Sequence, residues 1–66
     1  MKLKINGTDA EMQDGVTVSG LLETLQIEPA HVAVEVNLQI LKKCNFNDHA
    51  LRDGDSVEIV NFVGGG

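Results

Sequence analysis

The sequence predicts an α+β fold in which a mixed sheet of four to five strands packs on one helix. Apolar residues alternate with polar ones in several short segments, which is the period of a half-buried strand. One segment in the first half changes to the three-and-four spacing of an amphipathic helix, and no segment is repeated. A hairpin, then a helix, then further strands are typical of a sheet folded over a single helix.

The chain begins with a predicted hairpin. Residues 2–6 alternate polar and apolar side chains, and Asn6-Gly7 is a strong signal for a two-residue turn. Residues 9–13 continue the alternation as a second strand, and Asp14-Gly15 ends it. We therefore expect two antiparallel strands before the helix.

The helix is predicted from a single apolar stripe. Thr17 precedes the stripe and is suited to be the N-cap, whereas Gly20 stands where a capping box would have Glu or Gln. Pro29 is expected to end the helix because it has no N–H to continue the ladder. The stripe consists of Val18, Leu21, Leu22 and Leu25.

The second half of the chain is predicted to hold the remaining strands, at residues 32–36, 40–43 and 56–62. Turns are expected at 37–39 and 53–55, where Asn, Asp and Gly are frequent. Residues 45–50 show no clear period, so a loop or a 3₁₀ turn is expected there.

Strand periodicity divides the last strand into two faces. Val57 and Ile59 are expected to face the helix, because burial of the unpaired carboxylate of Glu58 would be costly. Val60 and Phe62 then point toward solvent with Glu58. Either they form a docking surface, or a neighbouring strand or loop covers them; periodicity alone leaves both interpretations open.

Length and charge restrict the function. A chain of 66 residues is a single small domain without room for a deep cleft, so we expect no enzyme active site within it. Ten acidic and five basic residues give a formal charge of -5, with two Phe and no Trp or Tyr. Nucleic acid and anionic membranes are therefore not expected as partners. A protein with a basic surface is expected instead.

Cys44 is the only cysteine, which excludes an intrachain disulfide and leaves a zinc or iron-sulfur cluster without ligands. His31 and His49 are isolated and suggest no metal site. Met1 leads directly into a strand with no apolar stretch of signal-peptide length, so a cytoplasmic location is expected. Cys44 follows two lysines and could accept sulfur, but a lone cysteine is more often incidental, and we do not include it in the site.

The chain is predicted to divide into a domain at 1–63 and a flexible tail at 64–66, because three glycines cannot pack a core and lose much entropy when ordered. Without Cβ atoms, glycines can enter a channel too narrow for other residues. Such a tail suits chemistry at the terminal carboxylate itself. Composition alone leaves the alternative that the glycines are merely a flexible end.

The run from Asp53 to Gly66, DGDSVEIVNFVGGG, resembles the end of the ThiS family of sulfur carriers of thiamin biosynthesis. Asn6-Gly7, the start of the helix and the segment VAVEVN at 32–37 agree as well, so the resemblance covers essentially the whole chain. The sequence departs from the family where Asn37-Leu38 replaces the usual Asn-Gly and where Gly20 interrupts the helix.

The resemblance implies a ubiquitin-like β-grasp fold and a role as carrier rather than enzyme. It implies that an enzyme similar to ubiquitin-activating enzymes adenylates Gly66 with ATP, and that a cysteine desulfurase or related persulfide donor supplies sulfur. The resulting thiocarboxylate would serve thiazole synthase, and the chain itself would bind no cofactor. Apart from the resemblance, the lack of side chains suits Gly64 and Gly65 to a partner's channel, and Val60, Phe62 and Val63 are the candidate docking residues.

Two alternatives remain at this point. The first is a sulfur carrier of the molybdopterin type, which would share the fold and the activation chemistry. The second is a β-grasp module that binds proteins through its sheet surface and does not use the glycines.

Overall fold

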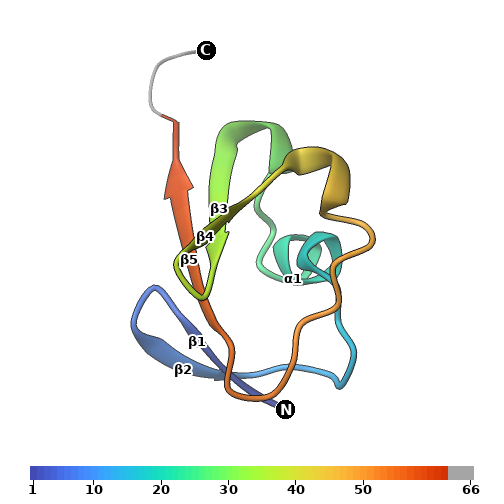
Figure 1. The fold of residues 1–66 in the computed structure, drawn as a ribbon, viewed down its shortest axis with the longest axis vertical. Coiled ribbons are helices and arrows are strands. Elements are labelled where there is room, and N and C mark those ends of the chain that lie inside the picture. Colours follow the sequence, from blue (N-terminus) through green and yellow to red (C-terminus); the bar gives the residue numbers. More distant parts are fainter. Residues whose placement is uncertain (63–66) are drawn as a thin grey trace.

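The computed structural model describes residues 1–62, which form a five-stranded sheet with the order β2-β1-β5-β3-β4 (Figure 1). Strand β5 pairs parallel with β1 and antiparallel with β3, so the predicted mixed sheet is confirmed. The strands are β1 (Lys2–Ile5), β2 (Thr8–Glu11), β3 (Val32–Val36), β4 (Gln39–Leu41) and β5 (Ser56–Asn61).

One α-helix, α1 (Val18–Thr24), lies between the two halves of the sheet in sequence. As predicted, Thr17 is its N-cap, and the Thr17 hydroxyl oxygen accepts a hydrogen bond from the backbone N–H of Gly20 at 3.0 Å. The cap satisfies one of the helix's free N-terminal donors.

The helix ends earlier than Pro29, which corrects the prediction. Gln26 adopts a left-handed φ of 60°, its N–H donates to Glu23 O at 3.0 Å, and the N–H of Ile27 donates to Leu22 O at 2.9 Å. This pair of bonds is a Schellman motif, normally made with glycine. Leu25 is the C-cap and is 37% exposed, so the buried stripe stops at Leu22.

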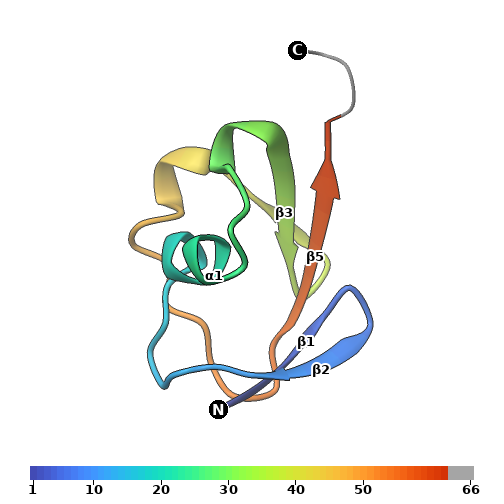
Figure 2. The ribbon, with the colours of Figure 1, turned by 180° about the vertical axis from the view of Figure 1, so that it is seen from behind.

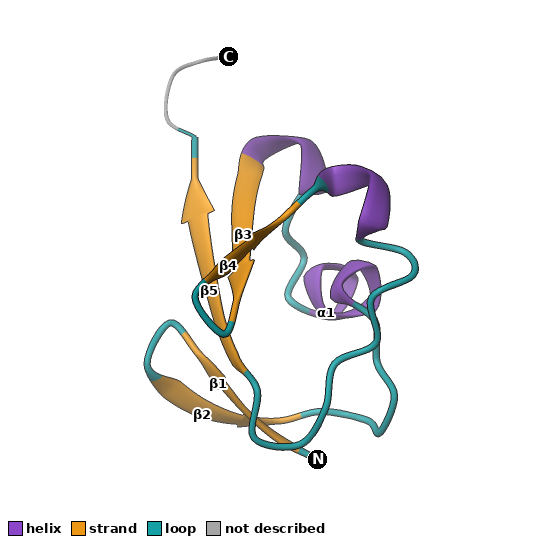
Figure 3. Ribbon diagram, in the orientation of Figure 1, coloured by secondary structure: helices purple, strands orange, loops and turns teal. Residues whose placement is uncertain are grey.

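Two 3₁₀ helices complete the described chain: η1 (Pro29–His31) and η2 (Lys43–Asn45). Pro29 opens η1 because its fixed φ and missing N–H suit a first helical position. Figure 3 shows all three helical segments on one side of the strands. The other side of the sheet carries no helix in residues 1–62, as the view from behind also shows (Figure 2).

The core lies between α1 and the inner face of the sheet. Val18, Leu21 and Leu22 of the helix are fully buried, as is Val57 of β5, and Ile59 packs partly buried against them. The remaining core residues come from both hairpins and from the connection after η2, where a loop or 3₁₀ turn was predicted: Leu3, Val32, Val34, Val36, Phe46 and Leu51.

The strand bounds differ from the predicted ones by one or two residues. Asn6 belongs to the first turn rather than to β1, and Phe62 follows β5. The fourth strand begins at Gln39 and ends at Leu41, not at Lys43, which opens η2. Register between strands decides these ends, and periodicity along one strand cannot show it.

No helix within residues 1–62 is both long enough and apolar enough to cross a lipid bilayer.

Candidate functional site at the end of the last strand

Strand β5 is the middle strand of the sheet and leads toward the predicted glycine tail. Its five register pairs with β3 run from Val36↔Val57 to Val32↔Asn61. The pairing continues one residue further, because Phe62 N–H donates to His31 O at 2.8 Å. The end of β5 lies at the opposite end of the molecule from the N-terminus (Figure 1). The sheet therefore holds the chain in a defined direction up to the last described residue.

Two asparagine side chains hold β5 from its two flanks. The amide of Asn6 accepts from Ile59 N–H at 2.7 Å and donates to Ile59 O at 3.2 Å. The amide of Asn37 accepts from Ser56 N–H at 3.0 Å and donates to the carboxylate of Asp55 at 3.0 Å. Sequence reasoning identified both asparagines only as turn residues.

The turns explain why asparagine occupies both positions. Asn6 and Asn37 have φ values of 50° and 52°, in the left-handed region that asparagine tolerates better than most residues. In that conformation each side chain lies beside β5. Its amide oxygen accepts a hydrogen bond from a β5 backbone N–H, as the carbonyl of a neighbouring strand would. One residue type therefore forms the turn and extends the hydrogen bonding of the central strand.

Val60 and Phe62 point away from the helix, as strand periodicity predicts, with exposures of 56% and 54%. The alternative that a neighbouring strand or loop covers them is wrong for residues 1–62. The Phe62 ring makes a cation–π interaction with Lys43 Nζ, which lies 5.1 Å from the ring centroid. Lys43 Nζ also donates to Ala30 O at 3.2 Å, so η2 supports the end of β5. A docking role for the two apolar residues stays a prediction.

The other predicted site residues, Val63, Gly64, Gly65 and Gly66, lie outside the described residues. The proposed boundary between a domain at 1–63 and a tail at 64–66 falls in the same segment.

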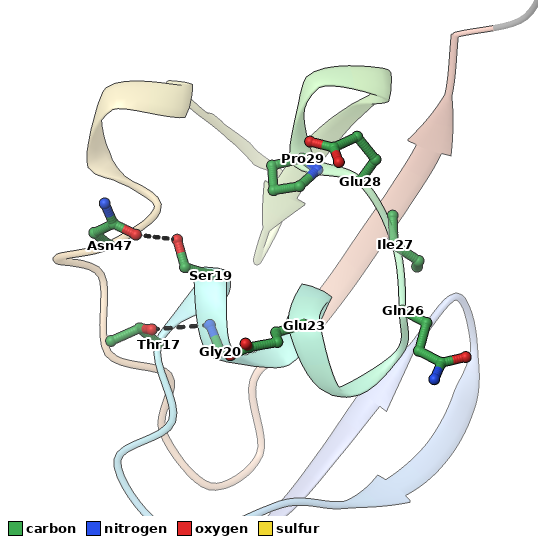
Figure 4. Close-up of a pocket in the computed structure, with 9 residues that line it drawn as sticks. All are labelled: Thr17, Ser19, Gly20, Glu23, Gln26, Ile27, Glu28, Pro29 and Asn47. Carbon is green, nitrogen blue, oxygen red and sulfur yellow. Dashed lines mark hydrogen bonds between the residues drawn. The ribbon is translucent and has the colours of Figure 1, made fainter.

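A depression beside α1 measures about 690 Å³ (Figure 4). Its hydroxyls have structural partners: Ser19 donates to the Asn47 amide oxygen, and Thr17 caps the helix. The carboxylates of Glu23 and Glu28 stand at its rim without a basic side chain among the lining residues. The hydrogen bond between Ser19 and Asn47 connects α1 to the loop after η2.

The isolated residues of the sequence analysis remain apart in space. Cys44 is exposed in η2, and its Sγ lies 3.9 Å from Asn45 Oδ1. His31 is exposed at the end of η1, and His49 is half-buried in the loop before Leu51. Within residues 1–62, no group of three or more metal-ligating side chains is brought together.

The family model of the ThiS family matches residues 3–66. A thiazole synthase of Paramagnetospirillum magneticum is 46% identical over 66 residues, which are the whole of this chain but 20% of that protein. The chain thus spans about a fifth of that relative's length.

A second relative and a solved structure match over nearly their full lengths. The sulfur carrier protein ThiS of Bacillus subtilis is 42% identical over 65 residues, 97% of this chain and 98% of that protein. The crystal structure of a thiamine biosynthesis protein (ThiS) from Geobacter metallireducens has a TM-score of 0.88 and 33% identity, with complete coverage of both chains. The shared fold and the family match to residues 3–66 lead to one conclusion: this chain belongs to the ThiS family.

Proposed function

We propose that this chain is a sulfur carrier of thiamin biosynthesis and that its reactive group is the carboxylate of Gly66. The observation that carries the proposal is the position of β5: it is the central strand of the sheet, it ends at Asn61, and in the sequence Phe62, Val63 and three glycines follow it. The family match extends through residue 66. The Bacillus subtilis relative, named a sulfur carrier protein, supports the same role.

The chemistry begins with activation of a poor acyl donor. A carboxylate oxygen of Gly66 attacks the α-phosphorus of ATP, the α–β phosphoanhydride bond breaks, and pyrophosphate leaves. The product is an acyl-adenylate, formed in the site of an enzyme similar to ubiquitin-activating enzymes. That enzyme must supply the cationic groups that bind ATP and position the two reactants, since this chain offers no basic cluster.

Sulfur then replaces AMP. The terminal sulfur of a persulfide, provided by a cysteine desulfurase or a related donor, attacks the acyl carbon and gives an acyl disulfide. A thiol must reduce the S–S bond to release the thiocarboxylate. Because the reaction consumes ATP, we place it in the cytoplasm. The chain takes part as a co-substrate and holds no cofactor of its own.

The acceptor that we propose for the sulfur is thiazole synthase. A relative of that name contains a segment 46% identical to this chain, which supports a close functional connection between the two. The glycines at 64–66 would enter the partner's channel, while Val60, Phe62 and Val63 would contact its surface.

The test is an intact-mass measurement. The full chain is incubated with ATP, the adenylating enzyme and a persulfide donor, and its mass is recorded under non-reducing conditions. We expect a gain equal to replacement of one oxygen by sulfur, mapped to Gly66, and no gain for a chain lacking Gly65 and Gly66. An unchanged mass, with an enzyme active on another carrier, would favour the sheet-surface binding module. Sulfur transfer to molybdopterin synthase alone would favour the other branch.

A further inference from the structure

The last described residue, Phe62, is held by two short helices that lie apart in the sequence. Its backbone N–H donates to His31 O of η1 at 2.8 Å. Lys43 Nζ of η2 lies 5.1 Å from the centroid of its ring and donates to Ala30 O of η1 at 3.2 Å. Figure 1 shows both helices near the end of β5. The contacts therefore form a closed loop that starts and ends at Phe62.

Both helices are fixed to the core, so this loop has a rigid base. Phe46 is the C-cap of η2 and is 3% exposed, and its N–H donates to Lys43 O at 3.1 Å. Val32 follows η1, is fully buried and is the register partner of Asn61. Contacts to groups that are already ordered cost less entropy than contacts between mobile ones. The loop is thus able to restrain a side chain that is half exposed.

Lys43 is engaged differently from the ammonium groups that form ion pairs. Within residues 1–62 the ion pairs use the Met1 ammonium and Lys4. Lys43 Nζ binds a carbonyl oxygen and an aromatic ring instead. A cation over an exposed ring changes an equilibrium by about two- to fivefold, and one hydrogen bond has a similar effect. Together they favour one position of the Phe62 ring.

The position of Phe62 matters because little of the chain lies between it and the proposed reactive carboxylate. Gly66 is four residues further along, which is at most about 13 Å of extended chain. Three of these four residues are glycines, and glycine loses more backbone freedom on ordering than any other residue. A chain that leaves the domain in one direction has fewer conformations to lose when a partner binds its end.

We propose that Lys43 is a positioning residue of the carrier, which acts through Phe62 to fix the direction of the chain toward Gly66. The inference rests on the proposed function and deepens it. Where only a fraction of the free chains has the competent direction, the apparent affinity for the adenylating enzyme falls by that fraction. Lys43 raises the fraction in the free carrier and takes no part in the chemical step. Its loss therefore raises the KM for the carrier and leaves kcat unchanged.

The test compares Lys43→Met with Lys42→Met. Methionine keeps an unbranched side chain but removes the ammonium, so each variant changes the formal net charge from -5 to -6. Lys42 is exposed, and its side chain makes no cap hydrogen bond to η2, which makes it the matched control. Lys43→Arg tests rescue, because a guanidinium keeps the charge, the N–H donors and the attraction to the ring. Adenylation is measured as pyrophosphate release at varied carrier concentration.

We expect Lys43→Met to raise the KM about three- to tenfold at constant kcat, because two contacts are lost. Lys43→Arg should restore the KM, and Lys42→Met should stay within about 1.5-fold of wild type. In the free chain, Lys43→Met should increase the amide exchange rate of Phe62 relative to that of Ile59 by about two- to fivefold. Its melting temperature should stay within about 4 °C of wild type, which excludes unfolding as the cause.

A double-mutant cycle with Phe62→Leu separates action through the ring from direct contact with the enzyme. Leucine keeps an apolar side chain but offers no aromatic face to the ammonium. In the Phe62→Leu background, Lys43→Met should therefore raise the KM by less than about twofold. Additive effects would show that Lys43 contacts the enzyme itself, and the positioning role would be wrong.

Other results would also overturn the inference. An equal KM change in Lys42→Met would assign the effect to net charge, and an effect on kcat alone would place Lys43 in the chemical step. The exchange measurement needs no enzyme, so an unchanged exchange rate at Phe62 would refute the restraint by itself. Failure of the proposed function is seen separately, because the wild-type chain would then release no pyrophosphate with an enzyme active on another carrier.

Discussion

The carboxamide of Asn6 makes two hydrogen bonds to the backbone of Ile59, accepting from its N–H at 2.7 Å and donating to its carbonyl at 3.2 Å. Strand β1 ends at Ile5, and the parallel ladder has its last register pair at Ile5↔Val57. The Asn6 backbone N–H donates to Val57 O at 2.9 Å, and the side chain then supplies the next two bonds. A turn residue thus extends the support of the strand that leads to the proposed reactive end.

Asn6→Ala should destabilise the domain by about 2 kcal/mol, because it removes two hydrogen bonds and because alanine tolerates a left-handed φ less well than asparagine. Asn6→Gly removes the same bonds but tolerates the turn, so it should cost about 1 kcal/mol. Urea unfolding measures both values. Amide hydrogen exchange should show a larger loss of protection at Ile59 than at Val34. Unchanged exchange at Ile59 would contradict the role assigned to this side chain.

The turn between β3 and β4 carries strain at Leu38. Asn37 and Leu38 are the two central residues, with φ of 52° and 71°, and Leu38 is 86% exposed. A left-handed φ costs a non-glycine residue about 1–2 kcal/mol. Leu38→Gly should therefore stabilise the domain by about 1 kcal/mol after the greater unfolded-state entropy of glycine is included.

Leu38→Ala is the matched control for the turn. It keeps the Cβ and the strain while removing an exposed side chain, so its stability should lie within about 0.5 kcal/mol of wild type. Thermal unfolding of Leu38→Gly and Leu38→Ala measures the two changes in stability. If alanine stabilised as much as glycine, the exposed side chain rather than the backbone conformation would be responsible.

Gly20 illustrates a conflict between helix propensity and packing. A Cβ at this position would lie 3.0 Å from Val16 Cγ2 and 3.4 Å from the Thr17 hydroxyl oxygen that caps the helix. Alanine has a helix propensity up to about 1 kcal/mol better than glycine, but the close contact opposes this gain. Gly20→Ala should therefore stabilise a Val16→Ala background more than the wild type. A double-mutant cycle with additive effects would refute the steric explanation.

The Met1 ammonium gives a pH-dependent contribution to stability. A hydrogen bond from the ammonium to Asp14 is the main cause that raises its pKa above the usual 8.0, and burial opposes the rise. Nitrogen and oxygen are 3.1 Å apart. Because the folded chain binds this proton more tightly than the unfolded chain, the stabilisation is complete below pH 8.0 and is lost as the pH rises through the folded-state pKa.

Asp14→Asn should reduce this stabilisation at neutral pH, and the difference from wild type should shrink above pH 8.0. Unfolding by urea at several pH values, on chains with an unmodified Met1, checks the trend. Asp48→Asn, at an exposed position that takes no part in the ion pairs found within residues 1–62, is the control and should show no such trend. A constant difference across the same pH range would rule out the ammonium as the linked group.

The residues of the sequence by themselves determined the order of elements, the Thr17 cap, the strand at 32–36 and the two faces of β5. These features follow from local periods and from side chains that act within a few residues. The sequence predicted the ends of the helix and strands less accurately. The helix ends in a Schellman motif at Gln26 and not at Pro29. The sequence does not predict this end, because glutamine rarely adopts the left-handed conformation that the motif requires.

Only the tertiary structure decided which distant segments meet. The parallel pairing of β1 with β5 places Asn6 beside Ile59, and the antiparallel pairing of β3 with β5 places Glu35 opposite Glu58. Neither contact leaves a local signal, because strand register is set by burial of one face against the helix and not by the residues that pair on the other. The support of the last strand and the charge of its outer face are therefore properties of the fold.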